Sequence, residues 1–364
     1  MEKEFYKSYV DELRDTIQHG TKRGEFRKSN AFLGADASRT FSTVSNKLKL
    51  NKASDIKLFE SLQPLNAISG KKVNYHLRPG AHPDFENLTD ENSFENHYIC
   101  SVFIDVKKST NLFKKYNPVT VANIINVIQR AAVHTTWYFD GYIQRYHGDG
   151  LFAYFGGKNI SMTEAVKSTL TATSFINYFM KNDLKKLFNE QGIENIYARI
   201  GIDIGEAEDV LWYKAGMGDC SEITTCSLHT SLASKMQGTA TSNGIVVGNN
   251  MKVNSTLSDE LFEHVRDVSG KVDSYAFEIP EESFYYKQWN FNWEKHLKSL
   301  PYIKTDATGN LYIQTKEKEE NERMQKLIAS TALINSGNAF TDRKGNITEV
   351  TTGVKNQDHR FHYE

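Results

Sequence analysis

The sequence lacks the features of a secreted, membrane-spanning or strongly charged protein. Its 364 residues include only three cysteines, Cys100, Cys220 and Cys226. They are odd in number and lack the spacing of metal ligands, which is typical of a reducing compartment. The amino-terminal residues are charged and hold no apolar stretch of the kind found in signal peptides. No run of about 18 apolar residues could form a transmembrane helix. We therefore expect a cytoplasmic protein that has no membrane partner.

Charge is also a weak signal. The 44 basic and 45 acidic residues leave a formal net charge of -1, which gives no indication of a nucleic-acid partner. Hydrophobic residues make up 39% of the chain and charged residues 24%, a composition typical of a globular protein with a sizeable core. The length predicts two domains, or one domain with substantial flanking segments.

The residue pattern divides the chain into three parts. Residues 1–95 are expected to form an amino-terminal extension, because one amphipathic helical stretch is followed by a long polar segment. Residues 96–255 alternate strands with amphipathic helices, which indicates an α/β or α+β sandwich. Residues 256–364 are expected to form a carboxy-terminal extension that acts as a sensor or regulatory region. Aromatic residues at alternating positions in 285–293 favour a half-buried strand there over an exposed binding surface.

In the middle part, individual elements can be predicted. Strands are expected at 97–105, 142–147, 151–155, 197–204 and, as the final strand, 244–247. Asn117 and Pro118 are typical of the start of a helix, with Asn as the cap and Pro at the first position. Further helices are expected at 163–181 and 227–237. Residues 205–224 are expected to be irregular.

Two aspartates lie where strands end or turn. Asp105 closes a buried strand and precedes a hydroxyl-rich turn, whereas Asp149 lies between two glycines in a tight turn. Two carboxylates that meet side by side repel each other unless a cation lies between them, and Mg²⁺ commonly uses one or two carboxylates together with substrate phosphates. Each motif alone is more often an ordinary turn or a solvated strand end. Their order and spacing together favour a metal site, and Thr110 in the intervening turn is a candidate for binding substrate phosphate.

Four segments resemble, in order and spacing, the class III nucleotidyl cyclases. They are FIDVKKSTNLF at 103–113, GDGLFAYFG at 148–156, RIGIDIGEA at 199–207 and SLHTSLASKM at 227–236. The resemblance covers roughly residues 97–250. It implies a ferredoxin-like α+β fold with a mostly antiparallel sheet, and head-to-tail homodimers with active sites at the interface. It also implies that a 3′-hydroxyl attacks the α-phosphate of a nucleoside triphosphate and releases diphosphate.

The same resemblance assigns roles to individual residues. Asp105 and Asp149 would bind two Mg²⁺ or Mn²⁺ ions, assisted by the carbonyl of Val106. Arg199 stands where the family has a phosphate-contacting arginine, and a salt bridge at a strand end is the alternative.

The final catalytic helix departs from the family pattern. Ser231 and Lys235 occupy the positions of the family's transition-state Asn and Arg. Lys235 keeps the positive charge but loses the fork geometry of a guanidinium. By this resemblance, the candidates for catalysis are Lys235, Ser231 and Arg199.

The positions that read the base also depart from the family. Arg145 and Thr224, or Thr225 after a one-residue slip, replace the Lys and Asp of adenylate-type members and the acidic residue and Cys of guanylate-type members. The parallel donors of Arg145 suit the adjacent O2 and N3 acceptors of cytosine better than the N3–H of uracil. We expect a pyrimidine triphosphate as the substrate, with CTP ahead of UTP.

These departures are similar to those of the bacterial pyrimidine cyclases of the Pycsar antiphage systems. That resemblance implies that cyclic CMP or cyclic UMP serves as a second messenger for a neighbouring effector in antiphage defence. The alternatives are a catalytically silent nucleotide-binding module and an adenylate or guanylate cyclase. A diguanylate-type palm is disfavoured because the turn reads YHGDGLF.

Overall fold

The computed structural model describes residues 5–20, 78–80, 82–90, 93–266, 274–279 and 282–314, with a few positions beyond. The chain divides into two units, residues 1–313 and 314–364. In the second unit, β14 (Ala339–Thr341) pairs antiparallel with β15 (Ile347–Val350). The predicted domain boundaries at 95 and 255 remain a proposal, since much of both expected extensions lies outside the described residues.

An eight-stranded sheet forms the centre of the first unit, with the order β10-β11-β8-β5-β2-β4-β3 and with β9 paired to β11. All described pairs in this sheet are antiparallel except β5 with β8. The expected mostly antiparallel α+β fold is confirmed. The strand bounds are β2 Ile99–Lys107, β3 Gly141–His147, β4 Gly150–Phe155, β5 Tyr197–Gly205, β8 Gly244–Gly248, β9 Phe262–His264, β10 Ser274–Ile279 and β11 Glu282–Phe291.

The central strand β2 divides its side chains between the two faces of the sheet, because successive residues of a strand point to opposite sides. Val102, Ile104 and Val106 belong to the main core, with the apolar faces of α6 (Pro118–Tyr138) and α7 (Met162–Tyr178). On the opposite face, the hydroxyl of Ser101 lies 2.8 Å from that of Thr230 in α9 (Leu228–Thr239). Asp105 shares this second face, because it lies four positions after Ser101 in the strand.

Helix starts are explained by local capping. The side chain of Asn117 accepts a 2.8 Å hydrogen bond from the backbone N–H of Thr120, and Pro118 occupies the first turn, as predicted. Ser161 and Glu164 form a reciprocal capping box at the start of α7. Helix α7 then runs into a π-helical turn, Phe179–Leu184, and α8 (Lys185–Glu190).

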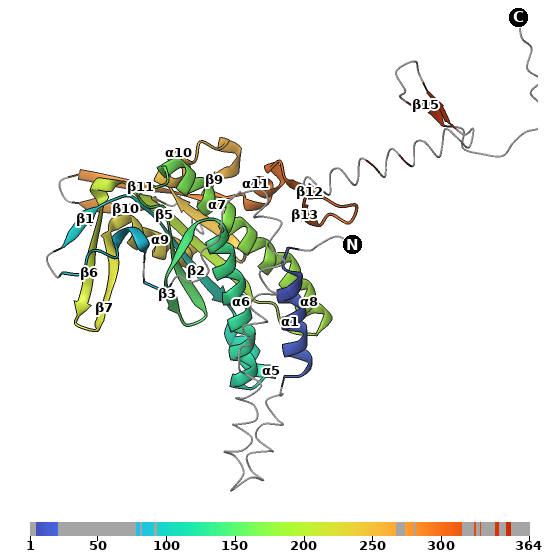
Figure 1. Ribbon diagram of the computed structural model, residues 1–364, viewed down its shortest axis with the longest axis horizontal. Helices are drawn as coiled ribbons and strands as arrows, with labels where there is room; N and C mark the ends of the chain where they lie inside the picture. The colour runs from blue at the N-terminus through green and yellow to red at the C-terminus, as the bar shows by residue number, and fades with distance from the viewer. Residues whose placement is uncertain are drawn as a thin grey trace, which may run out of the picture. The chain divides into compact units, whose positions relative to one another are not determined.

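The first helix, α1 (Lys7–Gln18), belongs to the segment expected to be an extension, yet it packs against α6. Its Leu13 is completely buried in the main core, and Tyr6 forms a 2.8 Å hydroxyl hydrogen bond with Thr135. Helices α1, α6 and α8 gather on one side of the main sheet, and the hairpin of β6 (Val210–Met217) and β7 (Cys220–Ser227) lies on the other (Figure 1).

Two expectations for the middle part are wrong. Residues 205–224 are not irregular, because β6 (Val210–Met217) and β7 (Cys220–Ser227) form a hairpin, which β1 (Phe94–Asn96) completes as a three-stranded sheet. The glycines there serve the hairpin: a Cβ on Gly216 would meet the Cys220 carbonyl oxygen at 2.2 Å. The strand at 244–247 is also not the last, since β11 pairs with it.

Four of the aromatic side chains predicted to be at least half-buried lie in the described residues and are buried. They are Tyr286, Trp289 and Phe291 on β11 and Trp293 after it, each at most 8% exposed. The remaining elements are η1 Pro83–Phe85, η2 Ser109–Asn111, α5 Leu112–Lys115, η4 Ala207–Asp209, α10 Asn249–Ser255, η5 Asp259–Leu261, α11 Trp293–Ser299, β12 Ile303–Thr305 and β13 Leu311–Ile313. None of the helices in the described part of the chain is long and apolar enough to cross a membrane.

Candidate active site

Asp105 lies near the end of β2, opposite Arg199 of β5 in the strand register. The Nε of Arg199 donates to the Asp105 carboxylate at 3.1 Å, and a second guanidinium nitrogen donates to the same oxygen. Both side chains are partly open to solvent, with 26% of Arg199 and 31% of Asp105 exposed. The salt-bridge alternative for Arg199 is therefore realised in this structure, and a phosphate contact by the same residue stays a prediction.

Asp149 lies in the tight turn between β3 and β4, which rests directly on the end of β2. Gly148 has a φ of 59°, in the left-handed region that favours glycine. A Cβ on Gly150 would stand 2.5 Å from the Ile104 carbonyl oxygen and 3.5 Å from the Cα of Asp105. Glycine at position 150 thus allows the turn to approach β2 closely, and this brings Asp149 beside the strand that carries Asp105.

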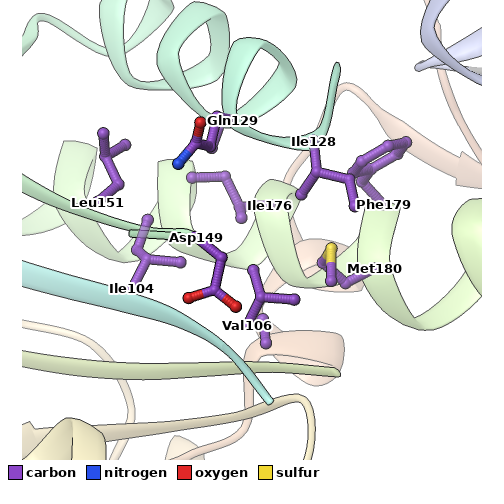
Figure 2. A pocket seen from close by; sticks show the side chains of 11 residues that line it. Ile104, Val106, Ile128, Gln129, Asp149, Leu151, Ile176, Phe179 and Met180 are labelled. Carbon is purple, nitrogen blue, oxygen red and sulfur yellow. The ribbon is translucent and has the colours of Figure 1, made fainter. Parts of the chain in front are cut away.

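The carboxylate of Asp149 lies between the side chains of Ile104 and Val106 (Figure 2). It accepts a hydrogen bond from the hydroxyl of Ser109, in the turn that follows β2. Gln129 of α6 donates to the Gly148 carbonyl at 2.9 Å and holds the turn from its other side. Sequence reasoning missed both residues. The adjoining cavity of about 20 Å³ is mostly apolar and too small for a nucleotide.

The structure therefore brings the backbone of the Asp149 turn against the end of β2 that holds Asp105 and Val106. The two carboxylates face different sides of β2, because Asp105 contacts Arg199 and Asp149 lies beside Ile104 and Val106. Within the described part of the chain, no group of three or more His, Cys, Asp and Glu side chains could hold a metal ion. The available donors are two carboxylates with nearby hydroxyl and carbonyl oxygens. This set fits Mg²⁺ or Mn²⁺ only if substrate phosphates and water complete the coordination shell, as is usual for Mg²⁺.

The turn after β2 contains one residue whose backbone is in the left-handed conformation. Lys108 has a φ of 68° and precedes the short 3₁₀ helix Ser109–Asn111. Thr110 is exposed in this turn, next to the Ser109 that contacts Asp149. A contact between Thr110 and substrate phosphate stays a prediction.

Ser231 and Lys235 are exposed on the outer side of α9. Ser231 donates to the Ser227 carbonyl at 3.2 Å, within the same helix. The buried side of α9 lies so close to β5 that a Cβ on Gly201 would meet the Ala233 carbonyl oxygen at 2.1 Å. The fold thus fixes α9 on the sheet and leaves both catalytic candidates facing outward.

Arg145 and Thr224 are brought into one neighbourhood by a β-bulge. The β3–β4 register shifts between Ile143 and Arg145, so Gln144 is an extra residue in its strand. Gln144 is buried and donates to the Ile223 carbonyl of β7 at 3.0 Å. A bulge of this kind redirects the next side chain. Arg145 accordingly reaches β7 and forms an ion pair with Glu222.

The hydroxyl of Tyr154 on β4 contacts two threonines of β7. The Tyr154 hydroxyl lies 3.4 Å from the Thr224 hydroxyl and 2.8 Å from that of Thr225. Burial raises the pKa of Tyr154, so the phenol stays protonated and can donate. Glu222 was missed by sequence reasoning because its segment carried no recognisable strand pattern.

In sequence, the chain is similar to curated cytidylate cyclases. No protein-family model matches the chain. A curated cytidylate cyclase of Staphylococcus aureus is 36% identical over 263 residues, which cover 68% of this chain and 59% of that protein. A cytidylate cyclase of Escherichia coli is 30% identical over 282 residues, which cover 75% of this chain and 59% of that protein. The chain thus spans about three fifths of the length of these relatives.

Solved structures give weaker matches. The adenylyl cyclase CyaB from P. aeruginosa aligns with a TM-score of 0.45 and 14% identity over 55% of this chain and 95% of that one. The guanylyl cyclase Cya2 aligns with a TM-score of 0.43 and 14% identity over 54% of this chain and 92% of that one.

The antiparallel sheet with its flanking helices is the fold expected of a class III nucleotide cyclase domain. In sequence, the chain is homologous to the curated cytidylate cyclases of S. aureus and E. coli.

Proposed function

We propose that this protein is a pyrimidine nucleotide cyclase that converts CTP, or UTP, to the 3′,5′-cyclic nucleotide and diphosphate. The observation that carries the proposal is the close approach of the Asp149 turn to the end of β2 that holds Asp105, in a chain homologous to cytidylate cyclases. Arg145 near Thr224 supports a pyrimidine substrate, because this pair differs from the purine-reading pairs of the class.

Asp105 and Asp149 would hold two Mg²⁺ or Mn²⁺ ions, with the Val106 carbonyl assisting. Bound ions of this kind activate an attacking hydroxyl and stabilise the charge of a leaving phosphate group. Ser109 would orient the Asp149 carboxylate through its hydrogen bond. The partly exposed ion pair with Arg199 compensates the charge of Asp105 and can be exchanged, so the guanidinium could turn to the substrate phosphates.

Lys235 and Ser231 would act on the phosphates from a second copy of the chain in a homodimer. Their outward position on α9 supports this arrangement, because a facing subunit can reach them. An equimolar mixture of Asp149→Ala and Lys235→Ala variants tests it. Half of the randomly formed dimers would carry one intact site, so we expect about a quarter of wild-type activity. Failure of the mixture to exceed the separate variants would contradict a shared site.

The activity is tested by incubating the purified protein and Mn²⁺ with equal amounts of ATP, GTP, CTP and UTP. We expect a cyclic pyrimidine nucleotide as the main product, with CTP consumed fastest. Asp90→Ala, which changes an exposed aspartate in the turn before β1, is the matched control for the aspartate variants. A preference for ATP or GTP would contradict our reading of Arg145 and Thr224, and a lack of any cyclic product would favour the silent nucleotide-binding module.

The cyclic product would act as a second messenger for a separate effector in antiphage defence, a role supported by the resemblance to pyrimidine cyclases of such systems. Neither a membrane nor nucleic acid is needed as a partner. Phage challenge of cells that carry the gene with its genomic neighbours tests this role. Protection that survives Asp105→Ala would contradict it.

A further inference from the structure

A third side chain, that of Glu222, lies beside the two residues expected to read the base, Arg145 and Thr224. It lies on β7 two residues before Thr224, so both side chains share one face of the strand. Its carboxylate forms an ion pair with the Arg145 guanidinium. The side chains are 27% exposed for Glu222 and 48% exposed for Arg145, so a ligand can reach both.

The backbone beneath this ion pair is held firmly. The bulge residue Gln144 anchors β3 to the Ile223 carbonyl at 3.0 Å, directly between Glu222 and Thr224 in sequence. On the other side, the hydroxyls of Tyr154 and Thr225 lie 2.8 Å apart. Ile223 packs against the cluster that contains Phe152 and Trp212. The backbone positions of Arg145 and Glu222 are thus set before any nucleotide binds, which lowers the entropic cost of recognition.

The hydrogen-bonding groups of this pair match one pyrimidine edge. Arginine provides parallel donors and no acceptor, whereas an ionised carboxylate provides only acceptors. Cytosine presents two acceptors, O2 and N3, beside the N4 amino donor. Uracil has the O4 carbonyl where cytosine has its N4 amino group. A carboxylate would there meet a second acceptor, with no proton between the two oxygens. A buried or partly desolvated mismatch of this kind is strongly unfavourable.

We propose that Glu222 is a specificity-determining residue that accepts a hydrogen bond from the 4-amino group of cytosine, while Arg145 donates to O2 and N3. This proposal rests on the proposed cyclase function and deepens it, because it explains how CTP is distinguished from UTP. Thr224 can donate or accept and therefore cannot make this distinction. An ion pair with a purely structural role on this surface would contribute little and would treat both nucleotides alike.

Glu222→Gln tests the proposal with almost no change in shape. We expect kcat/KM for CTP to fall about tenfold to a hundredfold while kcat/KM for UTP is unchanged or rises, because the amide can donate to O4. Glu208→Gln, on an exposed glutamate of η4, is the matched control and should leave the CTP-to-UTP ratio unchanged. A triphosphate of 2-pyrimidinone riboside, which lacks the 4-amino group, should be a poor substrate for the wild type and should be little affected by Glu222→Gln.

Two outcomes would overturn the proposal. One is an equal loss of kcat/KM for CTP and UTP, which would mean that Glu222 only supports Arg145. The other is an unchanged CTP-to-UTP ratio in a variant whose melting temperature matches the wild type. The affinities of non-reactive CTP and UTP analogues, measured by calorimetry, give the same ratio without turnover. If the wild type forms no cyclic product at all, the proposed function fails, and these affinities still test Glu222.

Discussion

Strand β5 carries two acid–base pairs on the same face, and they differ in burial and in connections. Arg199 and Asp203 lie four residues apart, about 13 Å along the strand. Arg199 and its partner Asp105 are each at least a quarter exposed. Asp203 is completely buried. It lies 2.8 Å from His229 Nδ1, and the hydroxyl of Tyr286 donates to it at 2.7 Å.

The difference indicates which of the two pairs can change partners. The exposed pair can exchange its partners for a cation or a phosphate, because water compensates each intermediate arrangement. The buried pair cannot, since removal of one partner leaves an uncompensated charge in the interior. A Cβ on Gly248 would meet the Asp203 carboxylate at 2.1 Å, so the backbone of β8 packs directly against this carboxylate. We infer that Arg199–Asp105 serves catalysis and that the cluster around Asp203 maintains the fold.

The largest expected effect is on activity. Asp149→Ala should lower cyclic nucleotide formation about a thousandfold or more, since metal charge is lost from the transition state. Its melting temperature should stay close to that of the wild type, because the side chain is partly exposed. Kinetics and thermal melting of the same sample check both parts. A variant that loses its fold, or one that keeps full activity, would break the distinction between the two pairs.

Asp203→Ala should show the opposite pattern. We expect the free energy of unfolding to fall by about 3 kcal/mol, because His229 and Tyr286 lose their shared buried partner. Urea denaturation measures this loss. Tyr286→Phe, which removes one donor and keeps the ring, should cost about 1 kcal/mol. Little effect of Asp203→Ala on stability would show that the buried cluster is not structural.

A smaller effect is expected for Arg199→Gln. The guanidinium competes with a cation for Asp105, so its removal should strengthen Mn²⁺ binding in the absence of nucleotide by about threefold to tenfold. Isothermal titration with Mn²⁺ measures the change, and Arg130→Gln, on an arginine of α6 paired with Glu12, is the control. Weaker Mn²⁺ binding in Arg199→Gln would contradict the exchange of partners.

The smallest effect is a pH dependence of stability. Burial alone would lower the pKa of His229, but the hydrogen bond and charge of Asp203, with Asp209 and Glu206, raise it above its ordinary value. Such a group stabilises the fold fully below its unfolded pKa, near 6.5, and loses that contribution as the pH rises through the folded value. Burial also raises the pKa of Asp203, which acts in the same direction. The buried Tyr286, whose pKa burial raises, stays neutral throughout.

We therefore expect the unfolding free energy to decline as the pH rises above about 6.5. His229→Asn should show a flatter profile and lower stability at the acidic end. Denaturation series at several pH values compare the two proteins. A wild type that becomes more stable as the pH rises over this range would contradict the assigned role of His229.

Features encoded in short stretches of sequence could be predicted. The run of β-branched residues before Asp105 became β2, the Asn117–Pro118 cap starts α6, and the glycines around Asp149 form the turn. These features depend on local conformational preference and on burial periodicity, which a single sequence reveals.

Features that depend on distant partners could not be predicted. The β7 strand is polar, and its pairing with β6 completes a sheet whose third strand, β1, lies more than a hundred residues earlier. The ion pair between Arg145 and Glu222 depends on that hairpin and on the bulge at Gln144. The choice between a salt bridge and a free phosphate ligand for Arg199 depends on strand register, which only the structure gives.

The most direct test of the account is the stoichiometry of products from CTP. We predict that the purified protein with Mn²⁺ forms cyclic CMP and diphosphate in equal amounts, and that Asp105→Ala and Asp149→Ala both stop the release of each. Diphosphate released without cyclic CMP, or equal product formation by the variants, would contradict the assignment of Asp105 and Asp149 to a cyclase reaction.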